Sequence, residues 1–91
     1  MSREEIKNKV IRIIDDTVNV NLDSFSNQQL ERSLFDLEIG LLPRDLLEIF
    51  FELQNVFNIN FEESDIINSR FDVLENIVEC IYVKEMSKQL A

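Results

Sequence analysis

The sequence predicts an all-α fold, a small bundle of three main helices and one short helix with a long first loop. The chain has 91 residues, which is the size of one small domain, so we expect a single domain over residues 1–91. A content of 45% apolar and 30% charged residues is typical of a globular chain. One glycine and one proline leave little material for tight turns. This shortage of turn-forming residues favours helices over hairpins.

The first helix is expected over Arg3–Val18. Ser2 and Glu5 have the spacing of a capping box, in which each satisfies a backbone N–H at the start of a helix. Apolar residues then recur at helical spacing, at Ile6, Val10, Ile13, Ile14 and Val18. The following stretch, Asn19–Gln29, is dense in Asn, Ser, Asp and Gln, whose side chains compete for local backbone hydrogen bonds. It is therefore expected to be a loop.

The second helix is expected from Pro43 to Phe57. Proline suits the first helical position because its missing N–H would be unpaired there, and Asp45 complements the helix dipole. Gly40 permits a backbone reversal before it. Apolar residues pin the preceding connection, with room for one short helical turn: Leu30, Leu34, Phe35, Leu37 and Ile39. The expected core face of the helix comprises Leu46, Ile49, Phe50, Leu53, Val56 and Phe57.

Two further helices complete the predicted bundle. After a short break over Asn58–Asn60, the stretch Glu62–Ile67 is expected to form a short helix. Asp72 and Glu75 have the spacing of a second capping box, which predicts the start of the last helix. Its core positions are Leu74, Ile77, Val78 and Ile81, and we expect it to end near Met86.

The charge balance restricts the class of partner. Nine basic and 18 acidic residues give a formal net charge of −9, which repels phosphate backbones and anionic lipid headgroups. No apolar run approaches the ~20 residues of a membrane-spanning helix. The first ten residues, MSREEIKNKV, lack the apolar region of a signal peptide. We therefore expect a cytoplasmic protein that binds neither nucleic acid nor membrane.

Catalytic and metal chemistry are not indicated. The chain has no histidine, so it lacks the usual general base and the usual activator of a Ser or Cys nucleophile. Cys80, the single cysteine, lies at the border of the last helix's core stripe with no basic cluster to activate it, and is expected to be a small core filler. No calcium-loop pattern or zinc ligand set is present. The sequence predicts no enzyme and no metal site.

The second helix has more apolar residues than one face can bury. At about 100° per residue, Phe51 points roughly 160° and Leu47 roughly 120° from the centre of the core face. Around them lie Arg44, Glu48 and Glu52. Exposed apolar residues with a charged rim are typical of a protein-binding patch. The alternative is that the long first loop folds over this side and covers both residues.

The order and spacing of these segments resemble the acyl carrier protein superfamily. The residues that carry the resemblance are SLFDLEIG (Ser33–Gly40), DLLEIFFELQNVFNINF (Asp45–Phe61) and FDVLENIVECI (Phe71–Ile81). The family attaches its phosphopantetheine arm to the serine of an Asp-Ser-Leu motif at the start of the second helix. Leu42, Pro43 and Arg44 occupy those three places here, so the resemblance implies that no cofactor is attached. Ser33, which is followed by Leu34, is the alternative attachment residue, although it precedes the helix.

The segment EIGLLPRDLLEIFFEL, which lacks the serine, looks most like acyl-carrier-related proteins of bacterial peptide-maturation (bacteriocin-type) systems. This resemblance implies a carrier-shaped adaptor that keeps a docking surface for partner enzymes, and we expect it to be a monomer. Leu47 and Phe51 fall where carriers contact their partners through apolar side chains, and Glu48 falls where carriers have a recognition acid. With Arg44 and Glu52, they form the expected partner-binding set. The implied partners have basic and apolar docking surfaces. The alternative function is that of a working acyl or aminoacyl carrier modified at Ser33.

Overall fold

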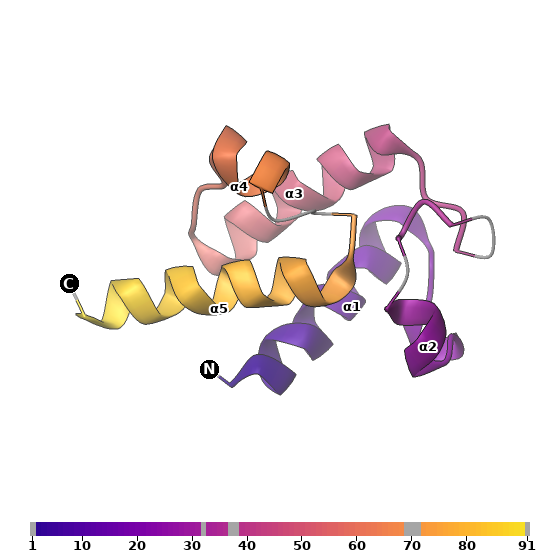
Figure 1. Cartoon of the computed structure of the whole chain (residues 1–91), viewed down its shortest axis with the longest axis horizontal. Helices are drawn as coiled ribbons and strands as arrows, with labels where there is room; N and C mark the ends of the chain where they lie inside the picture. The colour runs from indigo at the N-terminus through magenta and orange to yellow at the C-terminus, as the bar shows by residue number, and fades with distance from the viewer. Residues whose placement is uncertain (1, 32, 37–38, 69–71, 91) are drawn as a thin grey trace.

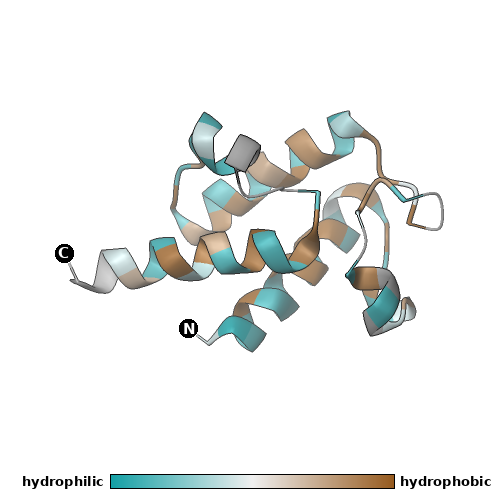
Figure 2. Ribbon diagram, in the orientation of Figure 1, coloured by the Kyte–Doolittle hydropathy of each residue, from teal (hydrophilic) through white to brown (hydrophobic). Residues whose placement is uncertain are grey.

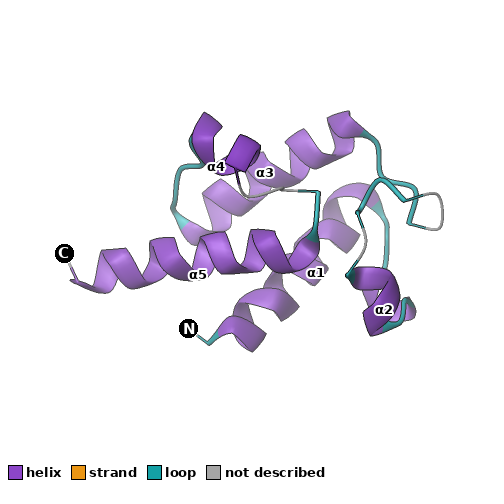
Figure 3. Ribbon diagram, in the orientation of Figure 1, coloured by secondary structure: helices purple, strands orange, loops and turns teal. Residues whose placement is uncertain are grey.

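The computed structural model describes residues 2–31, 33–36, 39–68 and 72–90, and it shows an all-α bundle (Figure 1). Three long helices form its body: α1 (Arg3–Val18), α3 (Pro43–Phe57) and α5 (Leu74–Leu90). The short α4 (Glu63–Asn68) connects the last two, and the long first connection contains η1 (Leu22–Ser24) and α2 (Asn27–Leu30). No strand forms within the described ranges, as Figure 3 shows. The predicted fold class is confirmed.

The ends of α1 and the C-terminal end of α3 follow from local side-chain chemistry. The Ser2 hydroxyl accepts a hydrogen bond from the Glu5 N–H at 3.2 Å, and the Glu5 carboxylate accepts one from the Ser2 N–H at 3.4 Å, so the predicted capping box is confirmed. α1 and α3 both terminate at an asparagine in the left-handed conformation, Asn19 with φ 59° and Asn58 with φ 53°. Asparagine is one of the few residue types that adopt this conformation readily.

The start of α3 is fixed by three neighbouring features. Pro43 is its first residue, as predicted. The Asp45 carboxylate accepts a hydrogen bond from the Leu42 N–H at 3.0 Å, which is the returning half of a capping box. Leu41 and Leu46 are both buried in the same core, at the two positions of a hydrophobic staple. The entry angle of the chain into α3 is therefore determined locally.

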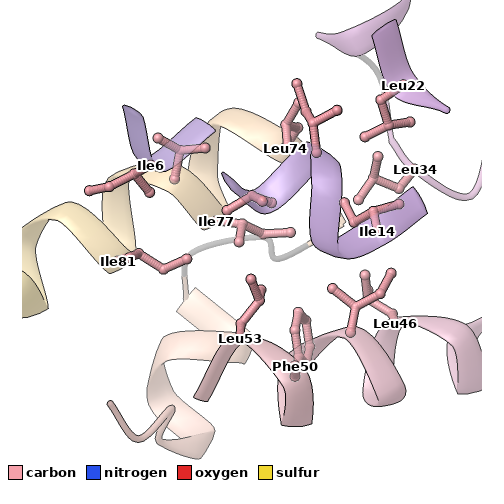
Figure 4. Packing of buried hydrophobic residues seen from close by; sticks show 14 of the residues in the cluster. Ile6, Ile14, Leu22, Leu34, Leu46, Phe50, Leu53, Leu74, Ile77 and Ile81 are labelled. Carbon is pink, nitrogen blue, oxygen red and sulfur yellow. The ribbon is translucent and has the colours of Figure 1, made fainter. Parts of the chain in front are cut away.

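The core lies where α1 packs against both α3 and α5. Figure 4 shows Leu46, Phe50 and Leu53 of α3 pointing toward the side chains of α1 and α5. Most predicted core positions are buried: Ile6, Val10, Ile14, Leu46, Ile49, Phe50, Leu53, Phe57, Leu74, Ile77, Val78 and Ile81. Ile13 and Val18 are partly buried and pack against this core. One prediction needs correction, because Val56 is 53% exposed. Val56 lies about 60° around the helix from Leu53, just outside the buried arc.

The last two helices differ from their predicted bounds. α4 begins and ends one residue later than the expected Glu62–Ile67. α5 continues to Leu90 and does not end near Met86. The stretch after Ile81 is rich in good helix formers and has no Gly or Pro, so the backbone stays helical beyond the last buried residue that is described. Hydrophobic and hydrophilic bands alternate along α5 in Figure 2.

The long first connection is more structured than predicted. The stretch expected to be a plain loop contains η1, whose Leu22 is fully buried, and most of α2. The Asn21 side chain caps η1 by accepting a hydrogen bond from the Asp23 N–H at 3.0 Å. The sequence left room for one short helical turn within residues 30–39, but the turn observed is α2, which ends at Leu30. Leu37 lies outside the described residues. This connection therefore contributes to the core.

A set of backbone contacts, here called the clasp, closes the connection ahead of α3. The Leu34 N–H donates to the Asp72 carbonyl oxygen, and the Leu34 carbonyl accepts from the Leu41 N–H at 3.2 Å. Ser33 and Val73 form an isolated antiparallel bridge. The clasp thus joins the first connection to the segment that leads into α5.

Candidate protein-binding face

The five residues predicted to bind a partner lie together on the solvent side of α3. This outer face comprises Arg44, Leu47, Glu48, Phe51 and Glu52, all of which are exposed. Phe51 is 65% and Leu47 56% exposed, the highest values among the large apolar residues that the structure describes. The first connection packs on α1 through η1, and it leaves both side chains uncovered. The alternative of a covering loop is therefore wrong.

The adjacent phenylalanines have opposite environments. Phe50 is buried and meets Phe61 edge to face, with ring centroids 5.6 Å apart. Figure 4 shows its ring directed into the core. Phe51 follows one residue later and therefore points about 100° further around the helix. One of the two rings stabilises the fold, and the other is available to a second molecule.

Charged and apolar side chains occupy separate flanks of the outer face. At about 100° per residue, Leu47 and Phe51 lie within roughly 40° of each other, as do Glu48 and Glu52 on the opposite flank. Arg44 projects between the two flanks. No ion pair within the described residues involves Glu48 or Glu52. The outer face therefore presents an apolar stripe beside two carboxylates that form no ion pair, with one arginine between them.

Charged residues of α1 and α5, in contrast, form ion pairs with each other. Arg3 contacts Glu79 at 2.7 Å and Lys7 contacts Glu75 at 2.8 Å. The Arg3 guanidinium also lies 4.0 Å from the ring centroid of Tyr82. The hydrogen bond from Arg3 lowers the pKa of the Glu79 carboxyl and raises the pKa of Arg3. These contacts fasten the start of α1 to α5 and leave few free cations there.

A third ion pair attaches α4 to α5. The Asp65 carboxylate lies 3.0 Å from the Lys84 ammonium and also accepts a hydrogen bond from the Glu62 N–H at 2.8 Å. The Glu62 N–H and then Lys84 lower the pKa of Asp65, while Asp65 raises the pKa of Lys84. Burial, together with the charge of Asp65, raises the pKa of the nearby Cys80 thiol. The thiol is therefore shifted away from the reactive thiolate form.

Replacing Asp65 with Asn should lower the free energy of unfolding by about 0.5–1 kcal/mol at pH 7, because a partly buried ion pair is lost while the capping oxygen is kept. A carboxyl whose pKa is lowered on folding stabilises the protein above its unfolded pKa, and this contribution is lost as pH falls through the folded value. The ordinary pKa is 3.8. Urea denaturation at several pH values should therefore show the two proteins converging below that pH. An equal difference across the acidic range would contradict the role of this ion pair.

Two further exposed apolar residues lie near the start of α3, and one of them corrects a prediction: Phe35, which was expected to pin the first connection to the core, faces solvent. Leu42 is 49% and Phe35 40% exposed. Each directly follows a buried leucine of the clasp, Leu41 or Leu34. Phe35 lies in a turn that the Asp36 N–H closes on the Ser33 carbonyl at 2.9 Å, and Leu42 is the last residue before α3. Neither exposure has a local signal in the sequence, because both depend on how the clasp folds.

The two positions considered for an attached arm, Pro43 and Ser33, differ in their surroundings. Pro43, in the place of the expected serine, is exposed at the first position of α3. Ser33 is only partly exposed, and its hydroxyl oxygen accepts a hydrogen bond from the Phe35 N–H at 3.1 Å. Ser33 thus belongs to the clasp, and it does not lie at the N-terminus of a long helix.

Other parts of the surface offer less to a ligand. A half-open hollow of about 430 Å³ lies between α1, the first connection and the start of α5, but its rim includes Arg3, Lys7 and Glu75, which are already ion-paired. Within the described ranges, no three His, Cys, Asp or Glu side chains gather as a metal site would require. None of the helices there combines the length and apolar character needed to cross a membrane.

Comparisons of the chain with models of protein families, with curated proteins and with solved structures found no significant match.

Proposed function

We propose that this protein is an acyl-carrier-like adaptor that lacks a phosphopantetheine site and binds partner enzymes through the outer face of α3. The observation that carries the proposal is the exposure of Leu47 and Phe51 beside the unpaired Glu48 and Glu52. Two exposed apolar side chains in a charged setting are typical of a protein contact that forms and dissociates. In this proposal the adaptor is a cytoplasmic monomer that acts in peptide maturation.

The residue at the start of α3 supports an adaptor over a carrier. A phosphopantetheine arm is held by a phosphodiester to a hydroxyl oxygen, and the Pro43 side chain has none. Proline also fits the first turn of α3 without the loss of a helical hydrogen bond, because a backbone N–H at this position would have no partner within the helix. The position is therefore compatible with a stable helix and incompatible with the attachment chemistry. In this proposal the protein therefore has no cofactor, and it has no catalytic activity of its own because the chain lacks the histidine that would serve as a general base.

Incubation with coenzyme A and a broad-specificity phosphopantetheinyl transferase should leave the mass of the protein unchanged. Attachment of one arm would add about 340 Da, which intact-mass spectrometry resolves easily for a protein of 10.8 kDa. A bona fide carrier protein in the same reaction shows that the transferase is active. A mass gain that maps to Ser33 would contradict the adaptor and establish the alternative of a working carrier.

The variant Pro43→Ser serves as a matched second substrate. It supplies the hydroxyl at the exposed first position of α3, but Leu42 and Arg44 still differ from the Asp-Ser-Leu pattern of carriers. We expect it to remain unmodified and to unfold at a free energy lower by about 0.5–1 kcal/mol, because proline restricts the unfolded chain. Efficient labelling would show instead that one substitution is enough to separate this protein from a carrier.

A further inference from the structure

We infer that the partner contacts the outer face of α3 with a basic amphipathic helix that lies along it, and this inference rests on the proposed function. The face is the side of a regular 15-residue helix, and helices commonly cover one another's sides by packing ridges into grooves. An amphipathic partner helix buries an apolar stripe in this way while its polar side remains in solvent. The chemistry of the partner follows from the two flanks.

The apolar flank specifies the apolar stripe of the partner. Leu47 and Phe51 are one helical turn apart, so a facing helix contacts both with residues of its own spaced three or four apart. Phe51 is the larger and the more exposed, and aromatic residues near the centre of a contact contribute most to binding. Phe51 is therefore the main anchor.

The acidic flank specifies where the partner carries its charge. Glu48 and Glu52 are also one turn apart, and no ion pair within the described residues involves either of them. Because they occupy one flank only, the complementary Lys or Arg residues lie along one edge of the partner's apolar stripe. This asymmetry distinguishes the two directions in which a helix could lie on α3. The net charge of −9 further favours association with a cationic segment.

The exposed residues of the clasp extend the contact past the start of α3. Leu42 immediately precedes Pro43, and Phe35 directly follows Leu34, whose carbonyl accepts a hydrogen bond from the Leu41 N–H. Both side chains are exposed. Backbone hydrogen bonds fix both segments, so these side chains are presented at little further entropic cost. The docking surface thus comprises Phe35, Leu42, Leu47, Glu48, Phe51 and Glu52.

The test uses two synthetic peptides with the same amphipathic pattern, one built from Leu and Lys and the other from Leu and Glu. A length of about 18 residues gives a helix of about 27 Å, enough to span α3. Each peptide is titrated into the full-length, isotope-labelled protein, and amide shifts are mapped by NMR at about 0.05 M and about 0.5 M salt, where screening differs strongly. We expect the Leu/Lys peptide to shift the amides of α3 and of residues 35 and 42, and to bind at least about tenfold more weakly at high salt.

Variants distinguish binding at the outer face of α3 from nonspecific attraction of a cationic peptide to an acidic protein. Phe51→Ala should weaken binding at least about tenfold, whereas the paired change Glu48→Gln and Glu52→Gln should reduce mainly the salt dependence. The control is Met86→Ala, on the exposed part of α5, which should bind like the parent protein. Denaturation curves confirm that each variant is folded.

Three results would overturn the inference: equal binding of the Leu/Glu peptide, shifts centred on α5, or unchanged affinity of Phe51→Ala. Absence of binding by the Leu/Lys peptide would overturn it as well. None of these outcomes contradicts the proposal that the protein is an adaptor without a phosphopantetheine arm, provided that its mass stays unchanged in the transferase experiment. A mass gain in that test refutes the proposed function independently of where a peptide binds.

Discussion

Phe50→Ala should lower the free energy of unfolding by about 3–5 kcal/mol, whereas Phe51→Ala should lower it by less than about 1 kcal/mol. The ring of Phe50 is buried between the helices and packs on Phe61, so its removal leaves a cavity lined by atoms that cannot all move to fill it. Phe51 is 65% exposed, and its truncation removes little buried surface. Urea denaturation of the two variants and the parent protein gives both values.

The two phenylalanines are matched controls, because they share a residue type, a helix and nearly the same sequence position. Alanine is also a better helix former than phenylalanine, by an amount that applies equally to both sites. The difference between the variants therefore reports burial alone. A loss for Phe51→Ala comparable with that for Phe50→Ala would mean that α3 is buried on two sides, and the outer face would not be available to a partner.

Leu34→Ala should destabilise the protein by about 2–5 kcal/mol, although Leu34 belongs to no helix. Its side chain is fully buried, and its backbone N–H and carbonyl group both make hydrogen bonds in the clasp. Loss of the side chain opens a cavity at the point where the first connection meets the segment before α5. Chemical denaturation measures the loss, and hydrogen exchange at the Leu41 amide shows whether the clasp loosens with it.

Phe35→Ala is the companion variant, because Phe35 follows Leu34 directly but points outward. Its expected loss is below about 1 kcal/mol. If Leu34→Ala were as well tolerated as Phe35→Ala, the burial of the Leu34 side chain would contribute little to stability.

The two helices α1 and α3 and the way each begins were predictable because their signals are local. The bounds of α1 and α3 follow from the capping box at Ser2, from Pro43 and from periodic apolar residues. Helical geometry also predicted the outward direction of Phe51 and Leu47, since a rigid helix fixes every side-chain direction once its core face is known.

What the sequence did not predict depends on contacts between distant segments. The burial of Leu22 in a polar stretch requires α1 to lie beneath it, and the exposure of Phe35 and Leu42 requires the clasp. Val56 lies at the edge of the apolar arc, where burial depends on whether a neighbouring helix reaches that far. The same holds for charge: Glu75 and Glu79 are ion-paired while Glu48 and Glu52 are not, and nothing in their local sequence distinguishes them.

The left-handed residues that end α1 and α3 make solvent exposure a poor guide to which substitutions the chain accepts. Asn19 and Asn58 are both exposed and would pass for freely variable surface positions. Their positive φ angles exclude most side chains, and β-branched ones above all. In a library of random variants, glycine should be the replacement retained at both sites and valine and isoleucine the ones eliminated. Sequence drift at the surface of this protein is thus limited by backbone geometry at two points where no buried contact imposes a limit.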